Sequence, residues 1–365
     1  MIIHFFHSDR NRAPQFITYV VDQFESPEMC SEFVIVSDSE HDEITIHNRK
    51  IRYVNSAAIG SFLESLCGYS AIVLHGLFYP WCECVLRKVP KQVKVAWMFW
   101  GGELYGGNSV FLAPYSRFLN NLHSLIKKEA PQWHLPSELY QRIDYCLTGE
   151  KEEYEYAKEF LNLERTEHIW YTYYSIEDTV GELYDSFSWG NNVWLCNSSS
   201  IENNAFDAIA RLLRPKNRKH LRGRTIIMPL SYGALWIRNA MTRIGPVAFR
   251  SGFHPLLDFM PRVEYNRLLL DCSTIILPHY RPAAQGNILT ALWLGIRVYL
   301  SEKSMSFLFF KRLGVHIYSF ESDFYRFGCS RLSKYEVDNN RRILSEWYGK
   351  KHIKEACLNV VFKLQ

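Results

Sequence analysis

Long apolar stretches are scarce in this sequence of 365 residues. No segment approaches the roughly 18–20 consecutive apolar residues that a membrane-spanning helix needs. The opening letters, MIIHFFHSDRNR, place a run of about five apolar residues ahead of their charges, which is the reverse of a signal peptide. We therefore expect a cytoplasmic protein that is soluble or bound to a membrane surface.

Two phosphate-binding motifs are also missing. No GxGxxG follows the first strand-like run, and no GxxxxGK[ST] occurs anywhere in the chain. Their absence removes most of the support for dinucleotide oxidoreductases and P-loop enzymes. A carboxylate pair that could hold a metal at a strand end is nearly missing too, because only Asp38 and Glu40 come close, and we interpret them as a solvated turn.

Paired cysteines are lacking as well. The nine cysteines are an odd number without the spacing of a secreted disulfide framework, so we expect reduced thiols in an intracellular protein. Cys82 and Cys84 have no second ligand pair nearby, which argues against a zinc site. We expect a protein that needs no metal.

The excess of positive charge is small, at +4. It is too weak to indicate a nucleic-acid-binding surface. The charge is nevertheless uneven, because RPKNRKHLRGR, residues 214–224, holds six basic residues and His220 but no acid. Such a run is typical of a solvated helix end and loop, and it also fits a surface attracted to anionic lipid headgroups.

Apolar and aromatic residues are plentiful. Hydrophobic residues make up 47% of the chain and aromatic residues 15%. This composition suits sizeable cores, and the length suits two domains of ~150–200 residues each. The aromatic excess fits sugar-facing surfaces and aromatic-rich cores equally well.

Short apolar runs alternate with helix-like segments along both halves of the chain. The runs include residues 2–6, 71–76 and 93–100 in the first half, and 192–197 and 274–278 in the second. This alternation predicts doubly wound α/β domains with parallel sheets. We expect an α/β fold of two Rossmann-like domains facing a cleft.

The domain boundaries follow from the same pattern. We expect the first domain at residues 1–180, the second at 190–332, and a helical tail at 333–365 that packs back on the first domain. Residues 175–191 are acidic and aromatic without clear periodicity, so we predict a linker there.

Two loops of the second half carry residues suited to an anion. Ligands of open α/β sheets sit beyond the carboxyl ends of the strands. CNSSSIENN, residues 196–204, ends a strand and opens a helix, whose N-terminus favours phosphate; a plain helix cap at Ser200 or a neighbour is the alternative.

The second loop is RPAAQGNIL, residues 281–289. Gly286 permits close backbone approach, Gln285 and Asn287 offer directed hydrogen bonds, and Arg281 presents a bidentate cation suited to a diphosphate. An arginine paired with a carboxylate at a domain edge is the alternative. Because two such loops fall on one sheet edge, we predict a binding site for a nucleotide diphosphate there.

The first half contributes two candidates near strand ends. Glu103, in WMFWGGELYGG, is a candidate general base or substrate contact, although a lone carboxylate at a helix start is commonly a cap. His75, in LHGLFYP, is a candidate contact, although a satisfied core histidine fits as well.

These motifs resemble a known family. HGLFYP, FWGGELY, LCNSSSIENN, IIMPLSYG and RPAAQGN…LWLGI occur in the order found in TDP-N-acetylfucosamine:lipid II N-acetylfucosaminyltransferases, the 4-alpha-L-fucosyltransferases of glycosyltransferase family 56. The resemblance spans roughly residues 1–320. Its most specific pieces are residues 100–105 and Arg281 with Gln285–Gly286.

The resemblance implies a GT-B fold and a metal-independent glycosyltransferase. The donor would be a dTDP-linked deoxyamino sugar similar to Fuc4NAc, and the acceptor a saccharide linked to polyprenyl diphosphate. Members act at the cytoplasmic face of the inner membrane, in the synthesis of enterobacterial common antigen or a related O-antigen-like polysaccharide. The protein would be peripheral on that membrane.

The resemblance also assigns residues. The catalytic pair would be Glu103, at a position where many members carry aspartate, and Arg281, at the diphosphate. The donor-binding residues would be Asn197, Ser198, Ser199, Asn203, Pro229, Tyr232, Gln285, Gly286 and Asn287. The acceptor-binding residues would be Asp9, His75, Gly101 and Gly102. Ser199 stands where the family usually has glycine.

Gln285 gives separate support for a deoxyribose donor. Many transferases with two Rossmann-like domains place a glutamate in this loop to bind both ribose hydroxyls, and dTDP lacks one of them. An amide also binds ribose, so a UDP- or GDP-sugar transferase stays open. A non-catalytic protein that binds glycans or nucleotides stays open as well, and so does the stereochemistry of transfer.

Overall fold

The structure is a computed structural model that describes residues 1–8, 13–24, 31–39, 44–46, 49–65, 68–106, 108–127 and 133–365. Contacts divide the chain into two compact units. Unit 1 comprises Met1–Gly106, Pro131–Ser175 and Lys350–Gln365, and unit 2 comprises Gly107–Ala130 and Ile176–Gly349.

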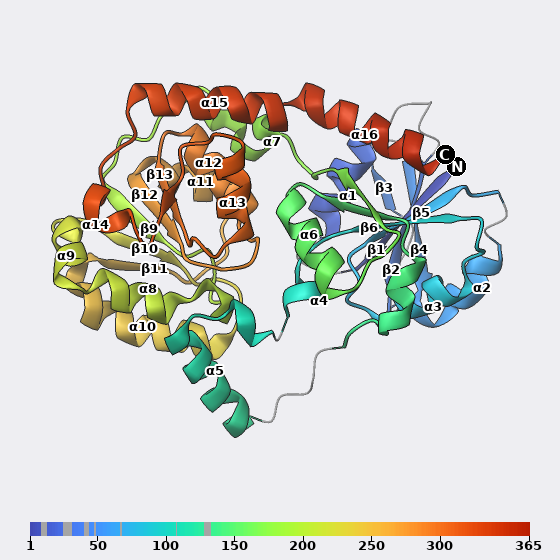
Figure 1. Ribbon diagram of the computed structural model, residues 1–365, viewed down its shortest axis with the longest axis horizontal. Coiled ribbons are helices and arrows are strands. Elements are labelled where there is room, and N and C mark those ends of the chain that lie inside the picture. The colour runs from blue at the N-terminus through green and yellow to red at the C-terminus, as the bar shows by residue number, and fades with distance from the viewer. Residues whose placement is uncertain are drawn as a thin grey trace. The chain divides into compact units, whose positions relative to one another are not determined.

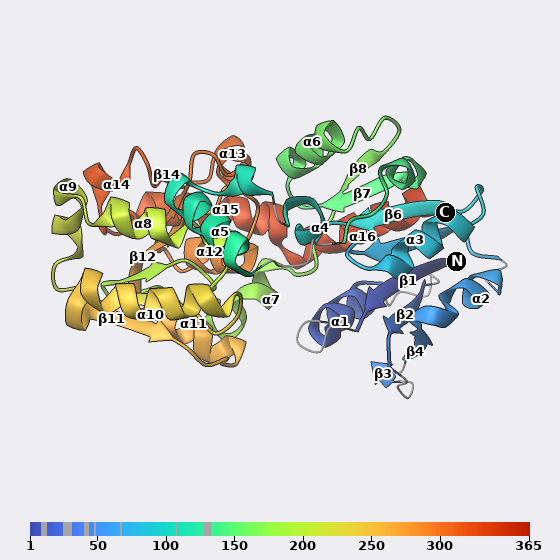
Figure 2. The same cartoon turned by 90° about the horizontal axis from the view of Figure 1, so that it is seen from below.

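Unit 1 is built on an eight-stranded sheet in the order β3-β4-β2-β1-β5-β6-β7-β8. All neighbours pair in parallel except β3 and β4. Figure 2 shows β3 and β4 at one edge of this sheet and β7 and β8 at the other. The strands are β1 (Ile2–His7), β2 (Ser31–Ser37), β3 (Ile44–Ile46), β4 (Arg49–Asn55), β5 (Ala71–His75), β6 (Lys94–Met98), β7 (Tyr145–Thr148) and β8 (Glu167–Trp170).

Helices cover both faces of this sheet. The central strands β1 and β5 are almost wholly apolar and buried, as expected of parallel strands between two helical layers. One face packs against α1 and α16. The helices of unit 1 are α1 (Ala13–Gln23), α2 (Ile59–Glu64), α3 (Pro80–Lys88), α4 (Gly102–Tyr105), α6 (Lys151–Phe160) and α16 (Lys350–Leu364).

Unit 2 holds a six-stranded parallel sheet in the order β11-β10-β9-β12-β13-β14. In chain order this is 3-2-1-4-5-6, the order of a Rossmann fold. The strands are β9 (Asn192–Leu195), β10 (Ile226–Pro229), β11 (Phe253–Leu256), β12 (Cys272–Leu277), β13 (Arg297–Leu300) and β14 (Tyr318–Ser319).

The helices of unit 2 form two layers around its sheet. Figure 1 shows α8 and α10 on one side of the strands and α12 and α15 on the other. The helices are α5 (Pro114–Lys127), α7 (Ile176–Val180), α8 (Ala205–Leu212), α9 (Pro215–Arg218), α10 (Leu235–Phe249), α11 (Arg262–Leu270), α12 (Gln285–Trp293), α13 (Met305–Arg312), α14 (Phe324–Phe327) and α15 (Lys334–Tyr348).

The α/β class with two Rossmann-like units is confirmed. The tail is two helices, and a capping box between Ser333 and Glu336 starts α15. The first residues of the predicted linker, 175–191, form α7, whose Ile176 and Val180 are buried and which packs on α12. Residues 107–130 count with unit 2, although the sequence pattern places them in the first half.

Candidate functional site

The strand order of unit 2 reverses between β9 and β12. Both strands are neighbours in the sheet, and their connections leave in opposite directions. A crevice outside the carboxyl ends of such a strand pair is the usual ligand site of an open α/β sheet. The loops that follow β9 and β12 are the two loops for which the sequence predicts anion binding.

Strained backbone gathers in these loops. Five non-glycine residues in the described part of the chain have positive φ, and three of them, Cys196, Asn204 and Ala284, lie in the loops after β9 and β12. Left-handed backbone costs a non-glycine residue roughly 1–3 kcal/mol and clusters at ligand sites. This clustering is a second reason to place the candidate site at the β9/β12 edge.

The polar side chains of the β9 loop mostly hold the loop itself. Asn203 donates from Nδ2 to the carbonyl oxygen of Ser198 at 3.0 Å and to its Oγ at 2.8 Å. Ser199 donates from Oγ to the carbonyl oxygen of Tyr232 at 2.6 Å. All three residues, Ser198, Ser199 and Asn203, are buried. These side chains therefore hold the loop in shape, and the donor contacts predicted for them stay predictions.

The loop after β10 joins the same edge. Pro229 is the buried last residue of β10, and Tyr232, which is exposed, accepts a hydrogen bond at its hydroxyl from Asn197 Nδ2 at 3.0 Å. Gly233 has a φ of +111°, and a Cβ there would lie 2.7 Å from the backbone carbon of Ser199. Of the donor-binding residues predicted in these two loops, Asn197 and Tyr232 are therefore the ones whose side chains stay accessible.

Asn204 ties three segments of unit 2 together. Its Oδ1 accepts from the amide of Ala113 at 2.7 Å, and its Nδ2 lies 3.3 Å from the carbonyl oxygen of Phe111 and 3.2 Å from that of Pro278. Asn204 is 1% exposed and has a φ of 51°. One side chain therefore fixes the β9 loop to the β12 loop and to the segment before α5.

We expect Asn204→Gly to lower the free energy of unfolding by about 3 kcal/mol, because buried groups lose their partners. Asn204→Ala should cost about 1 kcal/mol more, since alanine also carries the left-handed strain. Urea unfolding of both variants measures the difference. Equal stability of the two variants would contradict the assignment of strain.

The loop after β12 brings Arg281 and a residue that motif reasoning missed. Arg281 is half-buried and donates from Nη1 to the carbonyl oxygen of Pro282 at 3.3 Å. His279 is 1% exposed, and neither of its ring nitrogens has a hydrogen-bond partner among the described residues. Burial, and then the nearby Arg281 cation, lower the pKa of His279 to about 3, so its imidazole is neutral at pH 7. Its position directly after a strand-ending proline was the only sequence signal.

Three helices begin at this edge without a side-chain cap. They are α8, α10 and α12, which follow the neighbouring strands β9, β10 and β12. Uncapped first-turn N–H groups and the helix dipole together favour an anion. At the start of α12, Gln285 donates to the Tyr348 hydroxyl at 3.2 Å and Asn287 to the Tyr265 hydroxyl at 2.8 Å, so both amides are oriented.

Glu103 is the buried carboxyl group of α4 in unit 1. It is 5% exposed, and its Oε1 accepts from Trp97 Nε1 and from the amide of Trp100, both at 3.0 Å. Its Oε2 has no partner among the described residues. Burial raises the pKa of Glu103 to about 7, against three hydrogen bonds that lower it. A carboxyl group that ionises near neutral pH is suited to general base catalysis.

The two glycines before Glu103 shape this turn. Gly101 has a φ of +90°, and a Cβ on Gly102 would lie 2.7 Å from Phe78 Cε1. Larger residues would strain the backbone or displace the Phe78 ring. The acceptor-binding role predicted for Gly101 and Gly102 stays a prediction.

His75 lies inside a hydrogen-bonded chain in the core. Its Nδ1 is 2.9 Å from the Tyr173 hydroxyl, and its Nε2 is 3.1 Å from His4 Nδ1. Burial lowers the pKa of both imidazoles, that of His4 to about 3. Because His75 is 3% exposed and both its nitrogens are bonded, the geometry favours a core histidine over an acceptor contact. Asp9 lies outside the described residues.

The strand order of unit 1 reverses between β1 and β5, and that edge holds aromatic residues that the sequence reasoning missed. His7 stacks on Tyr79 with ring centroids 3.4 Å apart, and Trp81 donates to His7 Nδ1 at 3.3 Å. A hollow of about 470 Å³ is lined by Trp81, Cys84 and Lys88 of α3 and by residues at the start of α2 and just before it. The only sequence signal for these ring-bearing residues was their position after the ends of β1 and β5.

Neither a metal cluster nor a membrane span is found in the described ranges. No three His, Cys, Asp or Glu side chains there are grouped as metal ligands, and none of the helices there is long and apolar enough to cross a bilayer. The metal-independent interpretation stays a prediction.

The chain matches no protein-family model and no curated protein. It is similar to solved structures over its whole length. One is the N-terminal domain of trehalose-6-phosphate phosphatase from Candida albicans, with 9% identity, 96% of that chain covered and a TM-score of 0.64. Another is a glycosyltransferase from Rickettsia africae, with 10% identity, 98% covered and a TM-score of 0.61.

A third is a trehalose-6-phosphate protein from E. coli bound with UDP-2-fluoro glucose, with 9% identity, 96% of that chain covered and a TM-score of 0.55. At these identities the likeness shows the fold, which is the GT-B fold of two Rossmann-like domains. Membership of glycosyltransferase family 56 is not shown.

Proposed function

We propose that the protein is a glycosyltransferase that uses a nucleotide sugar. The observation that carries this proposal is the β9/β12 edge of unit 2, where three uncapped helix starts and Arg281 converge on one sheet edge. Such an edge suits a diphosphate. The Rickettsia africae structure with the same fold is itself a glycosyltransferase.

In this proposal each group of residues has its own role. The starts of α8, α10 and α12 bind the donor diphosphate, while Asn197, Tyr232 and Gln285 contact the nucleoside or sugar. Glu103 takes the proton of the acceptor hydroxyl while the oxygen of that hydroxyl bonds to the anomeric carbon of the donor sugar. The bond from that carbon to the diphosphate breaks, and the electron pair leaves with the nucleotide. Arg281 and the helix dipoles stabilise the charge that develops there.

The finer proposal is a dTDP-linked deoxyamino sugar similar to Fuc4NAc and an acceptor linked to polyprenyl diphosphate at the inner membrane surface. The order and content of the sequence motifs support it, and so does Gln285, where an amide stands in place of a carboxylate that would bind two ribose hydroxyls. No metal takes part in this scheme.

A UDP-sugar donor is the second candidate. The specific observation in its favour is the E. coli structure of the same fold, which is bound with UDP-2-fluoro glucose. Gln285 can hydrogen-bond a ribose hydroxyl as well as tolerate its absence.

A thermal-shift series with dTDP, UDP, GDP and NAD at equal concentration tests the donor class. A nucleotide present at 100 times its Kd adds about 2.7 kcal/mol to the stability of the folded state, which is a readily measured shift. We expect dTDP to stabilise the protein most and NAD not at all. Preference for UDP would select the second candidate, and no response to any nucleotide would contradict the proposed function.

A further inference from the structure

Helix α5 of unit 2 exposes an apolar face. Tyr115, Phe118, Leu122, Leu125 and Ile126 recur at spacings of three and four residues, so they share one side of the helix. They are between 46% and 79% exposed, with Leu125 at 79% and Ile126 at 73%. Large apolar side chains grouped on one exposed face mark an interaction surface.

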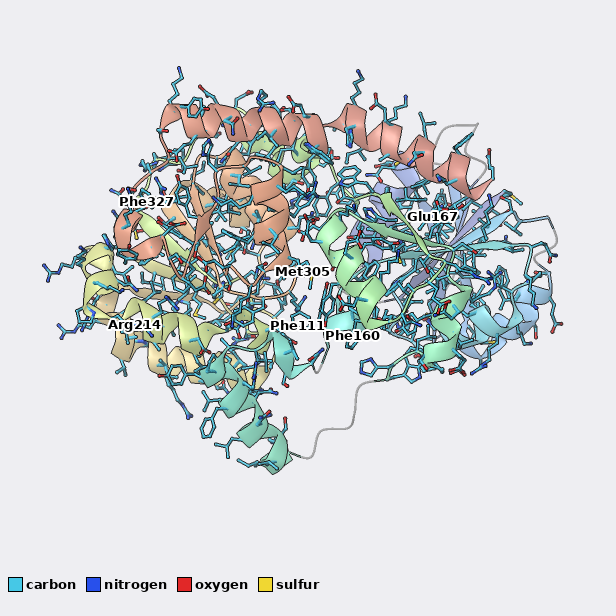
Figure 3. The ribbon with its side chains drawn as sticks, in the orientation of Figure 1. Phe111, Phe160, Glu167, Arg214, Met305 and Phe327 are labelled. Atoms are coloured by element: carbon cyan, nitrogen blue, oxygen red, sulfur yellow. The ribbon has the colours of Figure 1, made fainter. Side chains whose placement is uncertain are left out.

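Unit 2 holds α5 by other residues. Ser116 is the helix's buried residue, and its amide and hydroxyl both donate to Asp207 Oδ2 of α8, at 2.8 and 2.7 Å. His123 stacks on Trp236 of α10 with ring centroids 4.5 Å apart. Phe111, labelled in Figure 3, anchors the segment just before the helix by burying its ring. Because these contacts lie beside the apolar face, packing within unit 2 leaves that face uncovered.

The charges of α5 suit an anionic partner. The helix holds two cations, Arg117 and Lys127, and no acid, and Lys128 and Glu129 follow it in the sequence. By helical spacing, Arg117 and Lys127 lie away from the apolar face. A helix with aromatic and leucine side chains on one side and cations on the other suits the interface of an anionic bilayer. Fourteen residues are too few to span a membrane, so α5 bound to a bilayer would lie on its surface.

We propose that α5 docks the protein on an anionic lipid bilayer through Tyr115, Phe118, Leu122, Leu125 and Ile126. The lipid-linked acceptor in this picture rests on the proposed function, whereas the docking surface stands on the exposure and charge of α5. A second basic surface is available at α9, which follows α8 directly and is preceded by Arg214, labelled in Figure 3. Attraction at α9 alone would be electrostatic, while docking by α5 is also hydrophobic.

The test is co-sedimentation of the full chain with vesicles of phosphatidylcholine alone and of phosphatidylcholine mixed with phosphatidylglycerol. We expect binding to the mixed vesicles that persists in part at high salt, because buried apolar side chains are not screened. The double variant Leu125→Gln and Ile126→Gln should bind at least about tenfold more weakly, since it removes several apolar groups. Lys127→Gln should weaken binding by about fivefold.

Val247→Gln is the matched control, because Val247 of α10 is 83% exposed in the same unit but lies outside the apolar face of α5. It should bind vesicles as the unaltered chain does. Unaltered chain that ignores mixed vesicles, or a double variant that still binds them, overturns the proposal. The thermal shift with nucleotides is measured on the same samples, so a failure of the donor proposal is seen separately from a failure of docking.

Discussion

Glu103→Gln should lower the rate of glycosyl transfer by about 10²–10⁴-fold while leaving nucleotide binding unchanged. The loss follows because a positioned general base contributes about that factor, and the glutamine cannot take a proton. Glutamine keeps an acceptor oxygen for Trp97 Nε1 and the Trp100 amide, so the turn should fold normally. Steady-state transfer and a nucleotide thermal shift on one preparation separate the two effects. Full turnover by this variant would remove Glu103 from the chemistry.

The same carboxyl group should make the protein's stability depend on pH. Burial raises the pKa of Glu103 from its ordinary value of 4.5 to about 7 in the folded state. As pH rises from about 4.5 to 7, the unfolded state loses this proton first, so the free energy of unfolding falls by about 3 kcal/mol across that window. Below it the group is protonated in both states and contributes nothing. Glu103→Gln should abolish this component of the fall, as urea unfolding at pH 5 and pH 8 would show.

Arg281→Ala should lower kcat by about 10²–10³-fold, the usual cost of one lost donor to developing charge. The side chain is half-buried, so the change should cost little stability. Arg281→Lys should recover only part of the rate, because lysine keeps the charge but lacks the bidentate fork. Transfer by both variants, with donor breakdown followed in parallel, gives the comparison.

Arg214→Ala is the control for this series, since Arg214 is an exposed arginine of the same unit, at the start of α9. It should turn over as the unaltered enzyme does. If Arg281→Ala also turns over normally, the diphosphate is held by the helix starts alone and Arg281 has no part in transfer.

The elements of both sheets could be predicted from sequence where the strands are buried on both faces. Ile2–His7, Ala71–His75 and Cys272–Leu277 are mostly apolar and buried, and a run of that kind bounded by turn residues has few other structures available. β8 and β11 were missed because they are edge strands of four residues with polar or exposed positions. Such strands form because a neighbour offers pairing, which a local pattern does not record.

Some features of the candidate site could likewise be predicted from sequence, and others could not. The loops after β9 and β12 could be found because strand ends and helix starts are local signals. The left-handed backbone of Asn204 and Ala284 could not be predicted, because neither residue is glycine. The hydrogen bonds of Asn204 also reach 91 residues back, to Ala113. For the same reason residues 107–130 were placed in the first domain, since the contact that moves them to unit 2 is remote in sequence.

The core of unit 1 includes a helix that is translated after all of unit 2. Ile353, Cys357, Val360, Val361 and Leu364 of α16 pack with α1 and the sheet of unit 1. Until α16 packs, one face of the sheet of unit 1 exposes apolar side chains to water, so we expect a chain that ends before Lys350 to leave that face open.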